Sequence, residues 1–423
     1  MVLPQGGVSG LADMTSETDS AAKATGVIRI VMAGGGTGGH LYPGLAVADA
    51  LRARVSDKGS GKRELELIWA ATPRAVDQRL LAQFGEGYIR QPVQPLVKSL
   101  GKLWAFWTGW RQSCRYWAAY FAQNQVDAVV ALGGYAAGPA AYIAAQRGIP
   151  VILLNPDALP GRANRFLLKR ADVIVTQWPL DPALSRGIAD RVKPLGCPIR
   201  PELTGRTRAE GAARLGVDGA KKTLVVTGAS LGAKTINDAV LALLEDAGMR
   251  AAFCEQPKGG IPNGTNESAN WQIIHLTGMD QADAVRAAYA RFPDVRVKVI
   301  DYCDDMASLW AVTDLAIARA GASTCAELTA CGVPSILLPY PFHKDMHQRA
   351  NAQELVKAGA AVIVDDAKDA RRNALAIQNA LKTLLYDNAQ RCEMANRARQ
   401  AGKPQAADTI AREILGLIAA SSR

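Results

Sequence analysis

The chain has 423 residues, of which 49% are hydrophobic and 21% are charged. This length exceeds the size at which one hydrophobic core stops growing, so two domains are expected. The formal net charge of +10 favours an acidic partner, such as a phosphorylated ligand, anionic lipid or nucleic acid, although basic surfaces also occur without one. Lys, Arg, Gly or Pro interrupts every apolar stretch before it reaches the roughly 18 residues that span a bilayer, so a transmembrane protein is not expected.

The cysteines and the N-terminal segment indicate a protein that is not secreted. The seven cysteines are odd in number, scattered and never spaced as CxxC, which argues against a disulfide framework or a zinc site. Residues 1–26 are rich in Gly, Ser, Thr, Ala and acidic residues, and they lack a signal-peptide pattern. We therefore expect a disordered leader and a reducing compartment.

From residue 27, short β-branched runs alternate with Ala- and Leu-rich segments, a pattern typical of βαβ units in a parallel sheet. The strands predicted before a joint rich in Pro and Gly are 27–33, 66–70, 128–132, 151–154 and 173–176. The strands predicted after that joint are 223–227, 271–276, 295–300, 315–318, 335–339 and 361–364. Two doubly wound halves follow from this order, with 255–270 as an inserted surface loop.

The first strand leads into a glycine-rich turn and His40, before a helix expected from about 43 to 54. A strand, a glycine turn and a helix N-terminus can bring backbone N–H groups to a phosphate, although a tight connection without a ligand would look the same. A nicotinamide dinucleotide is disfavoured, because the second strand ends at Thr72 without an acidic residue and the next one is Asp77.

His40 lies where the carboxyl edge of the predicted sheet meets a helix start, the usual ligand crevice of an open α/β sheet. An imidazole there can take a proton from an attacking hydroxyl group. The alternative is a histidine that caps the helix or bonds to a neighbouring backbone group.

A second glycine turn, 228–233, ends the first strand of the second half. Its N–H groups and the Ser230 hydroxyl suit a diphosphate. The GxxxxGK[ST] spacing is absent, so a P-loop NTPase is not supported.

Thr324 and Glu327 have the spacing of a capping box, so Glu327 would close back on its helix start. The favoured alternative is a carboxylate that accepts hydrogen bonds from two ribose hydroxyls. Further along, Asp345, Gln348 and Asn351 share one helical face that suits sugar hydroxyls, or that is simply solvated.

Residues 100–121 mix aromatic and basic side chains, as expected at a membrane interface. A helix that packs on the core with a basic outer face is the competing interpretation. The predicted membrane contacts are Trp104, Trp107, Trp110, Arg111 and Trp117.

Together these motifs resemble the MurG family, which transfers GlcNAc from UDP-GlcNAc to undecaprenyl-pyrophosphoryl-MurNAc-pentapeptide, converting lipid I to lipid II. The resemblance covers about residues 27–420, through GGGTGGHLYPGLAVA, GGYAAGP, GASLGAKTIN, AGASTCAEL and HQRANA. It implies an α/β GT-B fold, with two Rossmann-like domains whose doubly wound parallel sheets face a cleft. The implied domains are 27–199, together with a C-terminal helix at about 405–423, and 200–404.

The resemblance also implies an inverting transfer to the MurNAc 4-hydroxyl that needs no metal and no cofactor, and the sequence has no DxD motif. The implied partners are UDP-GlcNAc, the lipid-linked MurNAc-pentapeptide acceptor, an anionic membrane surface and other cell-wall synthesis proteins, with no nucleic acid. The implied location is the cytoplasmic face of the bacterial cell membrane, as a peripheral protein.

Site residues follow from the resemblance by position. The donor-binding residues implied are Thr37, Gly38, Gly39, Arg200, Ser230, Cys303, Glu327, His347 and Gln348. The acceptor-side residues implied are Gly36, His40, Tyr135, Asn155, Asp157 and Asn164, with His40 as the catalytic base.

The chain departs from the family mainly on the acceptor side. Leu154-Asn155-Pro156-Asp157 stands where the family usually has HEQN, and GGYAAGP lacks the family's serine. Two alternatives therefore stay open. One is a related GT-B transferase that acts on another lipid, such as diacylglycerol, and the other is a UDP-sugar-binding protein without turnover.

Overall fold

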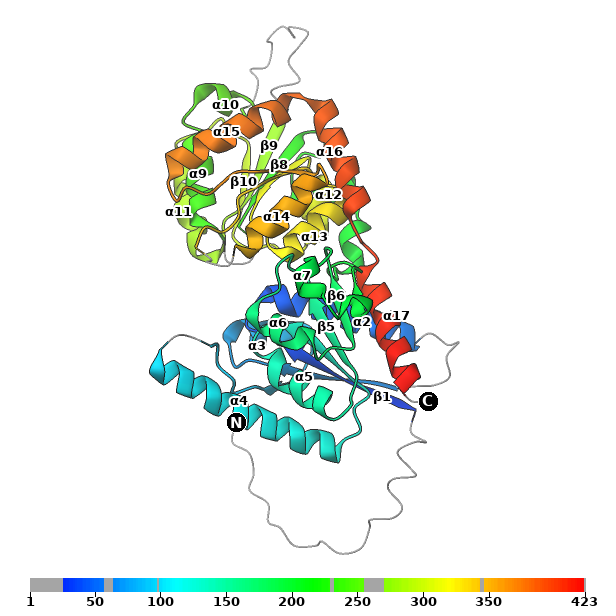
Figure 1. Cartoon of the computed structure of the whole chain (residues 1–423). Coiled ribbons are helices and arrows are strands. Elements are labelled where there is room, and N and C mark those ends of the chain that lie inside the picture. The colour runs from blue at the N-terminus through cyan, green and yellow to red at the C-terminus, as the bar shows by residue number, and fades with distance from the viewer. Residues whose placement is uncertain are drawn as a thin grey trace, which may run out of the picture.

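Two parallel sheets form separate layers of the chain, one in each lobe (Figure 1). The computed structural model describes residues 26–56, 64–96, 99–228, 232–254, 270–342 and 346–421. The leader 1–25 and most of the predicted loop 255–270 lie outside the described residues.

The first sheet has seven strands in the order β3-β2-β1-β4-β5-β6-β7, and every pairing is parallel. Its strands are β1 (Val27–Gly34), β2 (Glu64–Ala71), β3 (Tyr88–Arg90), β4 (Ala128–Gly133), β5 (Val151–Asn155), β6 (Val173–Thr176) and β7 (Val192–Lys193). All residues of β4 and β5 are buried, which explains why both strands read as uninterrupted apolar runs.

The second sheet has six parallel strands in the order β10-β9-β8-β11-β12-β13. Its strands are β8 (Lys222–Thr227), β9 (Trp271–Leu276), β10 (Val297–Ile300), β11 (Leu315–Ala318), β12 (Ser335–Leu337) and β13 (Ala361–Ile363). In each sheet the strand order reverses beside the first strand, as in doubly wound Rossmann-like folds. The predicted fold of two such domains is confirmed.

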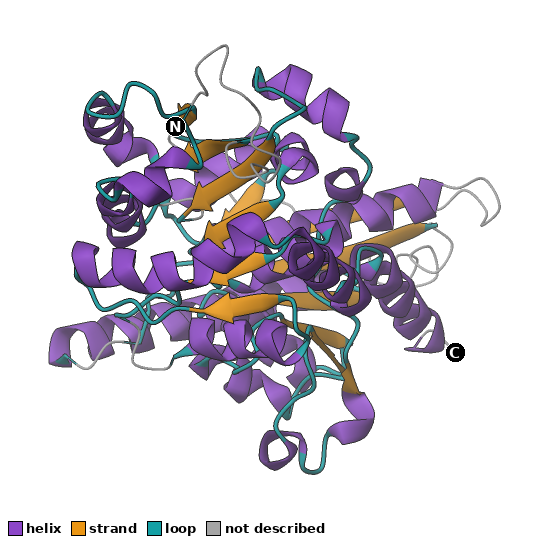
Figure 2. Cartoon of the chain, turned by 90° about the horizontal axis from the view of Figure 1, so that it is seen from above, coloured by secondary structure: helices purple, strands orange, loops and turns teal. Residues whose placement is uncertain are grey.

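Helices cover both faces of each sheet (Figure 2). The helices around the first sheet are α2 (Gly38–Ser56), α3 (Ala75–Gln83), α4 (Leu100–Gln123), α5 (Ala137–Gln146), α6 (Arg162–Leu168) and α7 (Pro182–Ser185). Those that follow are α8 (Arg208–Leu215), α9 (Lys234–Leu243), α10 (Ala247–Ala251), α11 (Ala282–Tyr289), α12 (Met306–Val312), α13 (Ala322–Cys331), α14 (His347–Lys357), α15 (Ala370–Tyr386), α16 (Asn388–Ala401) and α17 (Ala406–Ser421).

The last helix, α17, returns to the first domain and packs against α2 (Figure 1). Ile410, Ile414 and other apolar residues of α17 belong to the same core cluster as Leu51 of α2. The Arg54 guanidinium donates to both carboxylate oxygens of Asp408 at 2.6 Å each. The two ends of the chain are thereby joined in one domain.

Three details differ from the sequence prediction. Helix α2 begins at Gly38 rather than near Pro43, because Gly38 and Gly39 already lie in the helix and Pro43 lies inside it. The edge strands β3 and β7 were not predicted. They have three and two residues and are only partly buried, so they carry no apolar run.

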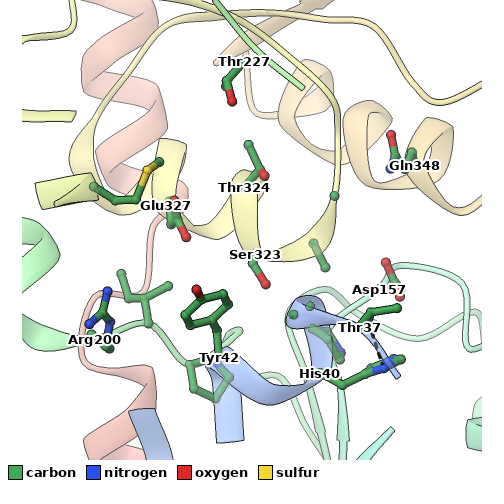
Figure 3. Close-up of a pocket in the computed structure, with 18 of the residues that line it drawn as sticks. Thr37, His40, Tyr42, Asp157, Arg200, Thr227, Ser323, Thr324, Glu327 and Gln348 are labelled. Carbon is green, nitrogen blue, oxygen red and sulfur yellow. Dashed lines mark hydrogen bonds between the residues drawn. The ribbon is translucent and has the colours of Figure 1, made fainter. Parts of the chain in front are cut away.

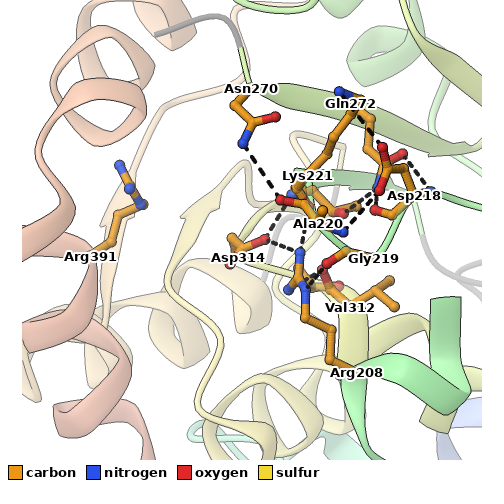
Figure 4. A network of polar contacts seen from close by, with 12 residues as sticks. Arg208, Asp218, Gly219, Ala220, Lys221, Asn270, Gln272, Val312, Asp314 and Arg391 are labelled. Atoms are coloured by element: carbon orange, nitrogen blue, oxygen red, sulfur yellow. Dashed lines mark hydrogen bonds and ion pairs between the residues drawn. The ribbon is translucent and has the colours of Figure 1, made fainter. Parts of the chain in front are cut away.

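One polar network joins α8 to the start of the second sheet (Figure 4). The Arg208 guanidinium donates to the carbonyl oxygens of Gly219 at 2.9 Å and Val312 at 3.0 Å. It also donates to the Asp314 carboxylate at 2.9 Å, which accepts the Thr223 N–H of β8 at 2.7 Å. This guanidinium therefore holds together segments that are far apart in the sequence.

We predict that Arg208→Ala lowers the free energy of unfolding by about 1.5–3 kcal/mol, the range for hydrogen bonds to charged groups. Urea denaturation of the whole chain measures this value. Arg286→Ala is the control, because Arg286 pairs only with the fully exposed Asp283 at i−3 among the described residues, and no measurable change is expected. Equal unfolding curves for the two variants would contradict the role given to Arg208.

Candidate functional site

A cavity of about 710 Å³ lies between the two domains. Its walls are the segments that follow the carboxyl ends of several strands, including Gly134 after β4, Asp301 after β10 and Gly321 after β11. Ligands of open α/β sheets bind in such a crevice, where the strand order reverses.

Most of the predicted site residues gather in this cavity. Those that line it are Thr37, Gly38, Gly39, His40, Asp157, Asn164, Arg200, Cys303, Glu327, His347 and Gln348. Gly36, Tyr135 and Asn155 do not line it, and Ser230 lies outside the described residues. Residues predicted to bind the donor and residues predicted to bind the acceptor therefore line the same cavity, although they come from segments up to about 300 positions apart in the sequence.

His40 lies in the first turn of α2, and its ring packs against the Gly133–Gly134 turn. Its Nδ1 is 3.2 Å from the Gly35 carbonyl oxygen and 3.1 Å from Thr37 Oγ1 (Figure 3). A carbonyl oxygen only accepts, so a hydrogen bond to Gly35 places the proton on Nδ1 and leaves the lone pair on Nε2, and the Thr37 hydroxyl can accept the same proton. Burial lowers the pKa of His40, although the nearby Asp157 acts in the opposite direction. The ring is therefore neutral near pH 7 and able to accept a proton.

The structure places three residues predicted on the acceptor side away from the cavity wall. The Gly36 N–H donates to both carboxylate oxygens of Asp77 at 2.8 Å, so it is not available to a ligand. Asn155 is 1% exposed, and its amide donates to the Asp157 carbonyl and accepts from Asn164 at 2.9 Å each. Asn155 thus supports the loop after β5 rather than touching an acceptor. Tyr135 lies outside the cavity wall as well, under the Arg74 guanidinium.

Asp157 faces the cavity and also joins the two domains. The Asn351 amide of α14 donates to Asp157 Oδ1 at 2.9 Å and to the Ala320 carbonyl at 3.1 Å, and it accepts the Ala158 N–H at 2.8 Å. Asn351 is fully buried. The predicted contact of Asn351 with sugar hydroxyls is therefore wrong, because its amide is consumed by the domain contact.

Glu327 lies in the second turn of α13 and points into the cavity (Figure 3). The Trp310 indole N–H donates to Glu327 Oε2 at 2.8 Å. Burial raises the pKa of Glu327 to about 7, while the Trp310 hydrogen bond and the positive Arg200 oppose this shift. The predicted capping box is absent, because the helix N-cap is Gly321 and it has no side-chain cap. The alternative, a carboxylate offered to a ligand, fits this geometry.

Two helix N-termini line the same cavity from opposite domains. Gly38, Gly39 and His40 open α2, while Ala322, Ser323 and Thr324 open α13 (Figure 3). The first N–H groups of a helix lack partners within it, and the helix dipole adds positive potential there. The cavity therefore offers two backbone sites for negatively charged groups.

Several lining residues were not predicted from the sequence. The Tyr42 and Tyr302 hydroxyls are 2.8 Å apart and join α2 to the segment after β10. Arg200 stacks on the Phe84 ring at 5.6 Å, which orients its guanidinium at the cavity wall. Tyr42 lies within the first motif, HLYPG, but nothing in its spacing indicates a partner 260 positions away.

The remaining residues predicted to bind the donor lie on the part of the cavity wall that the second domain forms. Gln348 Oε1 accepts the Tyr340 N–H at 2.9 Å, so the segment after β12 orients this side chain. Cys303 and His347 also line the cavity. Among the described residues, no group of three or more His, Cys, Asp or Glu side chains is arranged to hold a metal ion.

The aromatic and basic segment forms α4, which has one buried and one exposed face. Trp117 is fully buried, and its indole N–H donates to Gln91 Oε1 at 2.9 Å. Trp110 packs against the rings of Tyr142 and Phe166. Trp117 therefore belongs to the protein interior, which corrects its predicted membrane contact, whereas Trp110 is only partly buried among these rings.

The other residues predicted to contact a membrane lie on the exposed face of α4. Trp104 and Trp107 are 72% and 55% exposed, and Arg111 is exposed beside them. Large aromatic side chains are seldom this exposed without a reason. Within the described ranges, no helix has the length and apolar character needed to cross a membrane.

Comparison with known domains covers both halves of the chain. Residues 30–176 match the glycosyltransferase family 28 N-terminal domain, and residues 223–410 match the glycosyltransferase family 28 C-terminal domain. These ranges contain both sheets, except for the short edge strand β7, the first three residues of β1 and the first residue of β8.

Similar proteins align over almost the whole chain. Two are UDP-N-acetylglucosamine–N-acetylmuramyl-(pentapeptide) pyrophosphoryl-undecaprenol N-acetylglucosamine transferases. The one from Sorangium cellulosum is 36% identical, over 92% of this chain and 89% of the relative. The one from Acidothermus cellulolyticus is 34% identical, over 91% of this chain and 96% of the relative.

Solved structures agree with these relatives. The crystal structure of Acinetobacter baumannii MurG has a TM-score of 0.67 and 28% identity, over 92% of this chain and 99% of that one. A UDP-GlcNAc 2-epimerase from Neisseria meningitidis, at 14% identity and a TM-score of 0.58, shares the fold alone. The two family 28 domains, the similar transferases and the MurG structure together place the chain in the MurG family of GT-B glycosyltransferases.

Proposed function

We propose that the chain transfers GlcNAc from UDP-GlcNAc to the MurNAc 4-hydroxyl of undecaprenyl-pyrophosphoryl-MurNAc-pentapeptide, with inversion. The observation that carries this proposal is the cavity shared by the two family 28 domains. It presents a neutral histidine from one domain and a partly buried carboxyl group from the other. The relatives named above, which the chain covers almost completely, carry this activity in their names.

The donor fits the wall formed by the second domain. Its diphosphate would lie at the N-terminus of α13, where Ala322, Ser323 and Thr324 present their backbone groups. Glu327 would accept hydrogen bonds from the ribose hydroxyls through the oxygen that Trp310 leaves open. Arg200 would lie on the uracil side.

The sugar and the acceptor would meet at the opposite end of the cavity. Gln348 and His347 would contact the sugar hydroxyls, and His40 Nε2 would take the proton of the acceptor hydroxyl as its oxygen attacks the anomeric carbon. The bond from the anomeric carbon to the diphosphate breaks as the new bond forms. Helix dipoles would stabilise the charge on departing UDP, so the proposed reaction needs no metal ion or cofactor.

The test is UDP release by the purified chain from UDP-GlcNAc in EDTA, with a lipid I analogue, with diacylglycerol or with no acceptor. We expect release with the lipid I analogue alone. Release only with diacylglycerol would assign the chain to another lipid acceptor. Donor binding without release to either acceptor would favour a binding protein without turnover.

The pKa of Glu327 predicts how donor affinity changes with pH. With a pKa of about 7, the carboxyl group holds its proton at pH 6 and loses it at pH 8. Hydrogen bonds to a charged acceptor are stronger than those to a neutral one. The Kd for UDP-GlcNAc, measured by calorimetry, should therefore fall about fivefold to tenfold from pH 6 to pH 8.

Glu327→Gln is the matched control for this measurement. It keeps the shape of the side chain and removes the titration, so its Kd should be weak and flat over the same pH range. If the variant keeps the wild-type pH dependence, another group titrates and the role given to Glu327 is wrong.

We also propose that the chain binds the anionic cytoplasmic face of the cell membrane through the exposed side of α4. Trp104 and Trp107 would lie at the level of the lipid headgroups, with Arg111 near anionic lipid. A contact with other cell-wall synthesis proteins stays a prediction from the resemblance.

A vesicle assay tests this surface. Replacing both Trp104 and Trp107 with Ala should reduce binding to phosphatidylglycerol vesicles about tenfold or more, because each large side chain loses apolar burial. Leu375→Ala is the control, since Leu375 is 61% exposed on α15 in the other domain. Equal vesicle binding by the wild type and the double variant would contradict the proposal.

A further inference from the structure

A carboxylate lies buried behind the first glycine turn. Asp77, in the first turn of α3, is fully buried and is not part of the cavity wall. Its oxygens accept the Gly36 N–H at 2.8 Å each, and Oδ2 also accepts the Thr72 N–H at 3.0 Å and the Thr72 hydroxyl at 2.5 Å. A charge is kept in such a place only when hydrogen bonds offset the loss of water.

The turn is shaped to reach this carboxylate. Gly35 has a φ of +144° and Gly36 a φ of +89°, which side chains rarely allow. A Cβ atom on Gly35 would overlap Asp77 Oδ2. From the other side, the Arg74 guanidinium donates to the Gly36 carbonyl at 3.1 Å. Both backbone groups of Gly36 are therefore held by residues at the start of α3.

The hydrogen bond to Asp77 also fixes a group that faces His40. The Gly36 N–H and the Gly35 carbonyl belong to one peptide unit, which is planar and trans, so they point in opposite directions. Asp77 takes the N–H, and the carbonyl on the other side points at His40 Nδ1, 3.2 Å away. The orientation of this single peptide plane is therefore linked to the histidine.

We propose that Asp77 is a positioning residue that sets the tautomer of His40 through the Gly35–Gly36 peptide. While Asp77 holds the N–H, the Gly35 carbonyl accepts from Nδ1–H, and Nε2 keeps its lone pair toward the acceptor. If the peptide rotates, Nδ1 keeps only the Thr37 hydroxyl at 3.1 Å, which can donate to Nδ1 as well as accept from it, so the proton is free to move to Nε2. The inference rests on the proposed role of His40 as the base, but the tautomer itself can be measured without turnover.

The role also accounts for an acidic residue that the sequence left unexplained. Asp77 is the first acidic residue after the second strand, and it lies too late in the chain for a dinucleotide ribose contact. In the structure it points back to the glycine turn and away from the cavity.

The test uses Asp77→Asn in the full chain. Because the Gly36 N–H lies 2.8 Å from both carboxylate oxygens, either orientation of the amide sets its NH2 group against this donor, so the amide cannot hold Gly36 as the carboxylate does. We expect kcat to fall at least tenfold, because general base catalysis contributes roughly 10²- to 10⁴-fold. The KM for UDP-GlcNAc should change less than about threefold, as the donor lies on the other domain.

Imidazole ¹⁵N chemical shifts read the tautomer directly. The chain has four histidines, so a His40→Gln spectrum identifies the His40 signals. The wild type should show Nδ1–H, and Asp77→Asn should show a shift toward Nε2–H. Thr72→Val, which removes one hydrogen bond from Asp77, should shift the tautomer less but in the same direction. If Asp77→Asn does not fold, Thr72→Val replaces it in this test.

Asp172→Asn is the matched control. The Asp172 carboxylate accepts the Val151 N–H at 2.8 Å at the amino end of β5, the same chemistry away from the cavity. It should leave kcat and the His40 tautomer unchanged.

Wild-type kcat together with a wild-type tautomer in folded Asp77→Asn would overturn the proposal. So would equal losses of kcat in Asp77→Asn and Asp172→Asn. If the wild type releases no UDP, the proposed function fails instead, and the tautomer of the free protein still decides the role of Asp77.

Discussion

The site depends on hydrogen bonds that cross from one domain to the other. The buried Asn351 amide ties α14 to the loop that carries Asp157, and the Tyr42 and Tyr302 hydroxyls meet at the cavity wall. These contacts hold the carboxyl edges of two parallel sheets opposite each other. The N-termini of α2 and α13 then face one cavity, although these helices begin at positions as distant as 38 and 322.

The same contacts explain a departure from the family pattern. Asp157 stands where the family usually has the last residue of HEQN, and it is bonded to Asn351 while its side chain faces the cavity beside His40. Asn155, two positions earlier, is buried in support of the loop. The cavity wall beside His40 therefore contains a carboxyl group that a side chain of the second domain holds in place.

The sequence predicts the parts of the fold that repeat a strong local pattern. Strands such as β4 and β5 are buried on both faces, so their apolar runs identify them, whereas the short edge strands β3 and β7 have no such signal. The sequence also predicts that the first glycine turn approaches a ligand, and Gly38 and Gly39 line the cavity. Which of the turn's N–H groups remain available was not predictable, since the partner of Gly36 is a side chain 41 positions later.

The roles of individual side chains can likewise be predicted only where a local motif indicates them. His40 and Glu327 were placed in the cavity by position in a motif, because motif spacing fixes where a helix starts. Trp117 and Asn351 were misassigned because helical spacing does not tell which face of a helix is covered by another element. Their burial depends on packing between segments that are distant in the sequence.

The crystal structure of this chain with UDP-GlcNAc bound tests the account most directly. We predict the diphosphate at the N-terminus of α13, the ribose hydroxyls on Glu327, and the anomeric carbon facing His40 Nε2 across the domain boundary. A donor bound with its ribose away from Glu327, or with its sugar pointing out of the cavity shared by the two domains, would contradict it.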